Sequence, residues 1–234
     1  MFDTNTKRFA GMAGITFVVL YLVAFIAFIP SGLPNSGDPA SKVLAYAHVH
    51  RSALLTSAFL QSLAVIPWIA FVSGIVVMMR RSEGETGMWS MMAAIGGAIA
   101  AAMAMVACAL GAMLVYRAAA GDAGLARTLL DGNAIMFAMG GLPVAVFIYA
   151  ASQGLVRAGA VARWTAPLGM LVALIEIVGA ATYARGDGFF SPQGTYSYIA
   201  AFALALWTIA AGVELMREHA PVAAAHPPAA AAPA

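Results

Sequence analysis

Six long apolar runs constrain the fold of this chain more than any other feature. They cover residues 9–29, 53–79, 89–116, 132–156, 165–184 and 195–216. Each is long enough for an α-helix to cross the hydrocarbon core of a bilayer, which takes about 20 residues. A β-barrel would instead show segments of about ten residues that alternate apolar and polar side chains. The runs predict an all-α polytopic membrane bundle with six transmembrane helices.

The composition excludes most other classes of protein. Charged residues make up 9% of the chain and hydrophobic residues 62%, whereas a soluble domain has roughly 25% charged residues. The net charge is +2 and the basic residues are scattered, so the footprint of a nucleic-acid-binding protein is missing. The lipid bilayer is therefore the expected partner, and nucleic acid is not.

The chain is expected to form one six-helix transmembrane domain over residues 1–220, followed by a disordered Ala/Pro-rich tail over residues 221–234. Basic residues favour the cytoplasmic side of a membrane. With the N-terminus inside, seven fall on the cytoplasmic side (Lys7, Arg8, Arg80, Arg81, Arg157, Arg163, Arg217) and five outside (Lys42, Arg51, Arg117, Arg127, Arg185). Both termini are therefore expected in the cytoplasm.

The segment between the first two runs is expected to contain a short helix. Residues 34–37 have the composition of a turn. Asp38 then reads as an N-cap, followed by Pro39 at the first helical position. Apolar residues from Val43 to Ala47 recur at helical spacing. This pattern predicts a short interfacial helix on the outer side of the membrane.

Glu176 is interpreted as the one charged residue inside the apolar runs. A carboxylate at that depth costs a few kcal/mol or more, so it usually faces the bundle interior. Glu176 lies about 13 Å along its helix from Arg185, and the same depth in other runs gives Tyr21, Gln61 and Thr208. These four residues form a candidate binding layer, in which the Gln61 amide is the expected donor to Glu176. The alternative is structural, with a protonated Glu176 that only hydrogen-bonds two helices together.

The third run carries a small residue at every fourth position from Gly96 to Ala112, flanked by Gly97 and Ala101. Such a stripe lets helix backbones approach closely. It predicts either a central, tightly packed helix or an interface for a second copy or a membrane partner through Gly97, Ala101 and Ala104.

His48 and His50 are weak candidates for a metal or haem site. Two residues apart, they face different sides of a helix and the same side of an extended segment. The sequence contains no catalytic signature. No catalytic residue is assigned, no cofactor is expected, and an enzyme is the less favoured class.

Three features together resemble a known group of proteins. They are the Lys7-Arg8 tip of the first helix, the run Tyr46-Ala47-His48-Val49-His50-Arg51, and the Arg80-Arg81 pair that closes the second helix. This layout is similar to a domain-of-unknown-function family of uncharacterised bacterial six-helix integral membrane proteins. The resemblance implies a location in the bacterial inner membrane and assigns no catalytic residue.

Three hypotheses for the function follow. The first is a small transporter or small-molecule-binding protein with its polar layer around Glu176. The second is a structural or regulatory membrane subunit that docks through the third run. The third is an intramembrane enzyme or haem or metal protein that uses His48 and His50.

Overall fold

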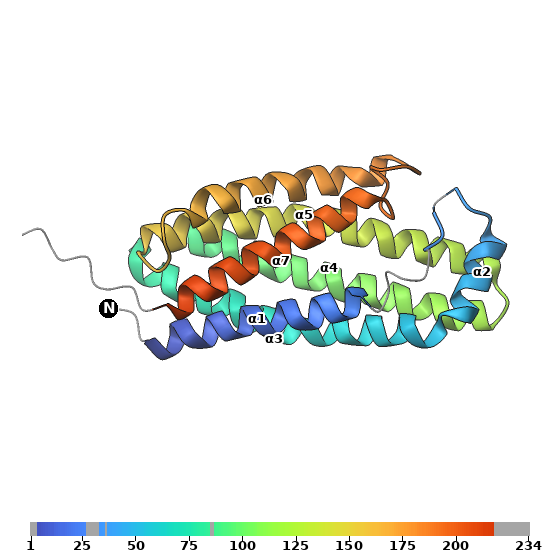
Figure 1. Cartoon of the computed structure of the whole chain (residues 1–234), viewed down its shortest axis with the longest axis horizontal. Helices are drawn as coiled ribbons and strands as arrows, with labels where there is room; N and C mark the ends of the chain where they lie inside the picture. Colours follow the sequence, from blue (N-terminus) through green and yellow to red (C-terminus); the bar gives the residue numbers. More distant parts are fainter. Residues whose placement is uncertain (1–3, 27–32, 36, 85–86, 218–234) are drawn as a thin grey trace, which may run out of the picture.

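The structure is a computed structural model that describes residues 4–26, 33–35, 37–84 and 87–217 (Figure 1). All regular elements within these ranges are helical. They are α1 (Thr4–Ile26), α2 (Ala40–Val49), α3 (Arg51–Glu83), α4 (Met88–Ala119), α5 (Ala123–Arg157), α6 (Thr165–Ala180), the 3-10 turn η2 (Ala181–Ala184) and α7 (Thr195–Met216). The predicted tail over residues 221–234 and the last residues of the first predicted run lie outside the described residues.

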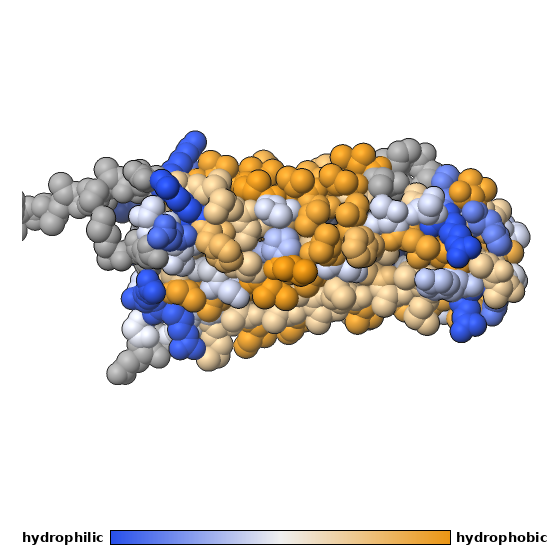
Figure 2. Space-filling model, turned by 90° about the horizontal axis from the view of Figure 1, so that it is seen from below, coloured by the Kyte–Doolittle hydropathy of each residue, from blue (hydrophilic) through white to orange (hydrophobic). Residues whose placement is uncertain are grey.

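Six helical segments are long and apolar enough to cross a membrane, which confirms the predicted fold class. On the face shown in Figure 2, most residues along the middle of the molecule are hydrophobic, and strongly hydrophilic residues gather at both ends. Large apolar side chains point outward within this band; Phe59 and Ile66 are each 66% exposed. Contiguous exposed apolar surface of this kind is typical of a surface that contacts lipid.

The predicted and observed helix ends agree for the last two segments, Thr165–Ala184 and Thr195–Met216. Helix α5, however, begins at Ala123, nine residues before the predicted start at Gly132. The reason is local, because the Asp122 carboxylate caps this helix by accepting the Leu125 N–H at 3.0 Å. Helices α3, α4 and α5 contain 33, 32 and 35 residues, or about 50 Å at 1.5 Å per residue. They therefore extend beyond a hydrocarbon core of about 30 Å.

The six long helices form a closed ring. Around the ring, α1 packs against α3, α3 against α4, α4 against α5, α5 against α6, α6 against α7, and α7 back against α1 (Figure 1). Glycines allow the first and last helices to meet, since a Cβ at Gly212 would lie only 3.0 Å from the Gly11 carbonyl oxygen. The ring has two ends, which we call the N-terminal end, where α1 begins, and the α2 end.

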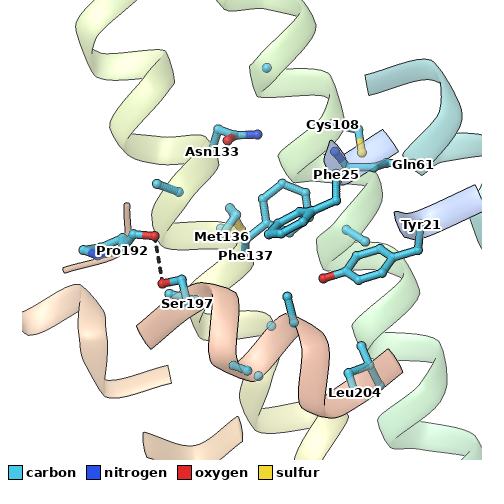
Figure 3. Close-up of a pocket in the computed structure, with 18 of the residues that line it drawn as sticks. Tyr21, Phe25, Gln61, Cys108, Asn133, Met136, Phe137, Pro192, Ser197 and Leu204 are labelled. Atoms are coloured by element: carbon cyan, nitrogen blue, oxygen red, sulfur yellow. Dashed lines mark hydrogen bonds between the residues drawn. The ribbon is translucent and has the colours of Figure 1, made fainter. Parts of the chain in front are cut away.

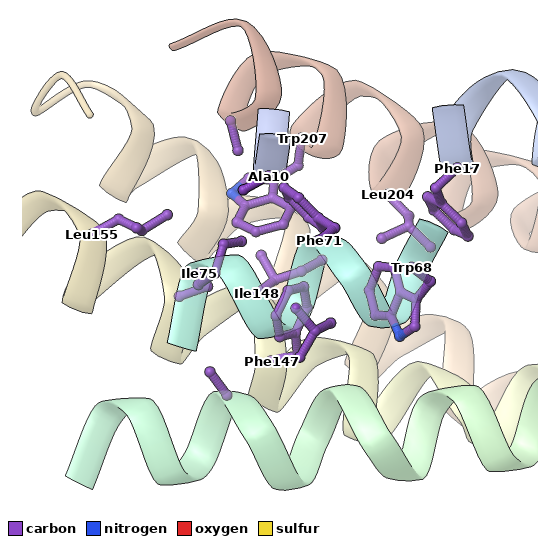
Figure 4. Packing of buried hydrophobic residues seen from close by; sticks show 14 of the residues in the cluster. Ala10, Phe17, Trp68, Phe71, Ile75, Phe147, Ile148, Leu155, Leu204 and Trp207 are labelled. Carbon is purple, nitrogen blue, oxygen red and sulfur yellow. The ribbon is translucent and has the colours of Figure 1, made fainter. Parts of the chain in front are cut away.

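Aromatic side chains fill the part of the ring nearer the N-terminal end (Figure 4). Phe71, Phe147 and Trp207 contact one another edge to face at 5.7–6.2 Å between ring centroids, and Trp68 lies 4.9 Å from Phe147. Both indoles donate hydrogen bonds, Trp68 to the Gly97 carbonyl and Trp207 to the Ser152 hydroxyl, each at 2.9 Å. Pairing these donors avoids the penalty of a buried unmet N–H. We refer to Trp68, Phe71, Phe147 and Trp207 as the aromatic cluster.

A second, smaller core closes the α2 end, and it confirms the predicted short helix. The buried face of α2 packs on the ends of α3, α4 and α5 through residues such as Val43, Leu114 and Leu130. The helix starts one residue later than predicted, with Pro39 at the N-cap position and no side-chain cap. The Asp38 carboxylate does not cap the helix, because it instead accepts the Asn35 N–H and the Lys42 ammonium, both at 2.8 Å.

Arg127 of α5 fastens the segment that precedes α2. Its Nη1 donates to the carbonyl oxygens of Asn35 at 2.8 Å and Asp38 at 3.0 Å. Its Nε donates to the Asp131 carboxylate at 2.9 Å. Because a charged donor makes stronger hydrogen bonds, these contacts hold the segment before α2 against α5.

Two residues of the small-residue stripe of α4 pack against neighbouring helices of the same chain. A Cβ at Gly96 would lie 2.8 Å from the Pro143 carbonyl oxygen of α5, and one at Gly97 would lie 2.8 Å from Val72 of α3. Helix α4 therefore approaches both neighbours closely, as a central packed helix does. A contact with a partner through Gly97, Ala101 and Ala104 stays a prediction.

Candidate functional site

A cavity of about 260 Å³ lies between the helices of the ring, between the aromatic cluster and the core at the α2 end. All six long helices contribute to its lining, together with Leu33, Pro192 and Gln193. Trp68 lies at the limit of the cavity nearer the N-terminal end, which we call its inner end. Leu54, Leu114 and Leu130 lie at the limit nearer the α2 end. Most of the wall is apolar, with a few polar side chains among aromatic and small residues (Figure 3).

Glu176 of α6 lines this cavity, is 6% exposed, and faces the bundle interior. Its Oε1 atom is buried, and no hydrogen-bond donor reaches it from the described part of the chain. The glycine opposite explains how the side chain fits, because a Cβ at Gly141 would lie 2.7 Å from the Glu176 backbone oxygen and 3.2 Å from Oε2. A buried acceptor without a partner is costly, so Glu176 is a group that a bound molecule could satisfy.

Two further members of the predicted layer line the same cavity. Tyr21 of α1 stacks between Phe17 and Phe25, with ring centroids 5.6 and 6.0 Å away, and its hydroxyl points into the space (Figure 3). Gln61 of α3 also lines the wall. The expected hydrogen bond from Gln61 to Glu176 is not formed, since the Gln61 amide nitrogen donates to the Ser57 hydroxyl at 2.9 Å.

Thr208, the fourth predicted residue, is buried but does not line the cavity. The register between α6 and α7 gives the reason. Gly169 lies against Trp207 and Gly179 lies against Ala200, so Glu176 is opposite a level of α7 nearer to Ala200 than to Thr208. Counting an equal depth from each helix end assumed that the helices start at the same height, whereas α7 crosses the bundle obliquely (Figure 1).

The sequence reasoning missed Asn133, a polar residue of α5 that lines the cavity (Figure 3). Its amide nitrogen donates to the Ala107 carbonyl oxygen of α4 at 2.7 Å. Asn133 lies eight residues from Gly141, which is about 12 Å along the helix, so it lies toward the α2 end from the level of Glu176. The missed signal was an amide at the second position of the fourth apolar run.

Glu176 is not the only acidic residue in the apolar runs, because Glu214 belongs to the last run and is also buried. Glu214 accepts a hydrogen bond from Arg217 at 2.7 Å and from the Ala162 N–H at 3.3 Å. It lies near the end of α7, outside the cavity lining. Its carboxylate thus has hydrogen-bond partners, whereas Glu176 Oε1 has none among the residues that the structure describes.

His48 and His50 lie at the α2 end, away from the cavity lining. His48 is exposed near the end of α2, and the His50 ring packs on Tyr46 at 4.7 Å between centroids. Within the described ranges, no group of three or more His, Cys, Asp or Glu side chains is placed to hold a metal ion. The metal or haem hypothesis thus gains no geometric support.

A smaller cavity of about 200 Å³ adjoins the first, and Pro192 and Gln193 line both. Its other lining residues include Asp131, Tyr183 and Arg185, so it is the more polar and charged of the two spaces. The short segment around Pro192 thus separates a charged pocket from the apolar cavity.

Comparison with protein-family models, with curated proteins and with solved structures gave no match to this chain. The function must therefore be argued from the cavity itself.

Proposed function

We propose that this chain is a multi-pass membrane protein that binds a small molecule in the central cavity, with Glu176 as the polar anchor at its inner end. The observation that carries the proposal is the combination of a cavity of about 260 Å³ between the helices with a carboxylate oxygen in its wall that has no donor among the described residues. Small-molecule sites are typically concave and mostly apolar, with a few polar groups that orient the ligand.

The proposed setting is the bacterial inner membrane with both termini in the cytoplasm, which places the cavity in the outer half of the bundle. Binding is proposed ahead of transport, because the aromatic cluster fills the ring between the cavity and the N-terminal end. Transport would require that cluster to open. The subunit and metal hypotheses stay predictions.

Two alanines of α4 provide a matched test. Ala104 lines the cavity, whereas Ala102 is exposed on the outside of the same helix. Ala104→Phe fills the cavity, and Ala102→Phe adds the same side chain facing lipid. The wild-type protein and both variants would be purified in mild detergent, and their bound small molecules would be extracted and quantified by mass spectrometry.

We expect the wild type and Ala102→Phe to carry the same molecule in near-equal amounts, and Ala104→Phe to carry at least tenfold less. Equal elution in size-exclusion chromatography would show that the variants are folded. The proposal is wrong if all three proteins carry the same molecules. It is also wrong if the wild type carries none and no compound of a metabolite library raises its melting temperature. A loss of assembly in Ala104→Phe alone would favour the subunit hypothesis.

A further inference from the structure

The charge of the cavity wall is one-sided. Glu176 is its acidic residue, and none of the described residues that line the cavity is Lys, Arg or His. When Glu176 is ionised, an anionic ligand would place a second negative charge beside it without any countercharge in the described lining. A cationic ligand would supply the partner that makes a buried charge tolerable. The sign of the wall thus selects for a cation.

The hydrogen-bond acceptors of the wall also favour a ligand that carries donors. The amide nitrogens of Gln61 and Asn133 are engaged by Ser57 and by the Ala107 carbonyl. Within the described residues, no donor reaches their side-chain carbonyl oxygens. The wall therefore presents a carboxylate oxygen and two amide oxygens as acceptors, beside the donors that remain in the Tyr21 hydroxyl and in the second N–H of each amide. A ligand that satisfies them must bring N–H or O–H donors.

The rest of the cavity suits an apolar body. Tyr21, Phe25 and Phe137 surround the space with aromatic rings (Figure 3), and rings of this kind also attract cations through their faces. An engineered apolar cavity of about 150 Å³ binds benzene. A cavity of about 260 Å³ therefore accommodates a body larger than one aromatic ring.

From these three observations we infer that the ligand is an amphipathic amine, with an ammonium head on Glu176 and an apolar body in the aromatic-lined space toward Asn133. This inference rests on the proposed function and names the substrate class of the same site. No covalent step is involved. The ammonium donates hydrogen bonds to the Glu176 carboxylate, and the apolar body lies against the aromatic rings of the wall.

Three probes with the same eight-carbon chain isolate the head group: octylammonium, octanol and octanoate. The full chain would be placed in phosphatidylcholine nanodiscs, and binding would be followed by melting temperature and by tryptophan fluorescence, to which Trp68 in the cavity wall contributes. Glu176→Gln removes the proposed anchor. Glu214→Gln is the matched control, since it makes the same chemical change at a buried carboxylate outside the cavity.

We expect saturable binding of octylammonium, at least tenfold tighter than that of octanol, and no binding of octanoate. Glu176→Gln should weaken octylammonium at least tenfold and bring it close to octanol, whereas Glu214→Gln should leave the affinity unchanged. Tighter binding of octanoate than of octylammonium, or equal binding of octylammonium to wild type and Glu176→Gln, would overturn the amine assignment.

The wild-type series keeps the inference testable if Glu176→Gln does not fold. The two proposals also fail separately. If octanol or octanoate binds better than the amine, and Ala104→Phe abolishes that binding, the cavity is a site for another class of molecule. If no probe distinguishes the wild type from Ala104→Phe and the two carry the same extracted molecules, the binding function fails as well.

Discussion

Replacing Gly141 by alanine is expected to force α5 and α6 apart and to destabilise the bundle. An added Cβ would lie 2.7 Å from the Glu176 backbone oxygen and 3.2 Å from its Oε2, and a backbone atom cannot move aside as the end of a side chain can. Overpacking a well-packed interior costs about 1–3 kcal/mol. The same substitution gains up to about 1 kcal/mol from helix propensity, which partly masks the steric cost.

The adjacent Gly140 removes that ambiguity. A Cβ at Gly140 would lie 4.0 Å from the Cβ of Met103, its nearest neighbour among the described residues, which is ordinary contact. Both variants gain the same helix propensity, so their difference isolates the steric term. Gly141→Ala should be less stable than Gly140→Ala by about 1–3 kcal/mol. Equilibrium unfolding in mixed micelles with increasing SDS, followed by tryptophan fluorescence, measures this difference. Equal stability of the two variants would show that α5 and α6 are not in such close contact.

Two further predictions concern the α2 end. Arg127→Met removes the hydrogen bonds to the Asn35 and Asp38 carbonyls, so chymotrypsin should cleave the chain near α2 faster than it cleaves the wild type. The control is Lys42→Met, which breaks an exposed ion pair and should leave the cleavage rate unchanged. Equal cleavage rates of the two variants would contradict the anchoring role of Arg127. The Lys42 hydrogen bond, followed by the Asn35 N–H, lowers the pKa of Asp38 below its usual 3.8. These contacts therefore stabilise the folded chain fully above about pH 4, and their contribution falls as the pH drops below 3.8. Amide hydrogens of residues 35–42 should lose protection from exchange only in that acidic range. Loss of protection above about pH 5 would refute the assignment.

The sequence predicted the helices far better than it predicted how they meet. Apolar length alone located six spans, because a bilayer imposes nearly the same requirement on every crossing helix. Asp38 and Pro39 marked the short helix to within one residue. The start of α5 was missed because residues 123–131 are only partly apolar, and they are helical here through the Asp122 cap and packing against α2.

The site was only partly predictable, since it depends on the relative heights of the helices. Glu176, Gln61 and Tyr21 line one cavity, whereas their role in binding stays a prediction. Thr208 does not line this cavity, because the oblique course of α7 shifts its register by several residues. The partner of Gln61 was also missed: Ser57, one turn away on the same helix, was a closer acceptor than any carboxylate across the bundle.

The position of α7 in the ring has a consequence for biogenesis. This helix forms the wall between α1 and α6, yet it is the last of the six to leave the ribosome. Until it inserts, a nascent chain ending before Thr195 would leave Glu176 and the aromatic side chains without their final neighbours. A chain that ends before Thr195 would therefore lack the α7 wall of the cavity, and the ligand proposed for it could be held only once residues 195–216 are in place.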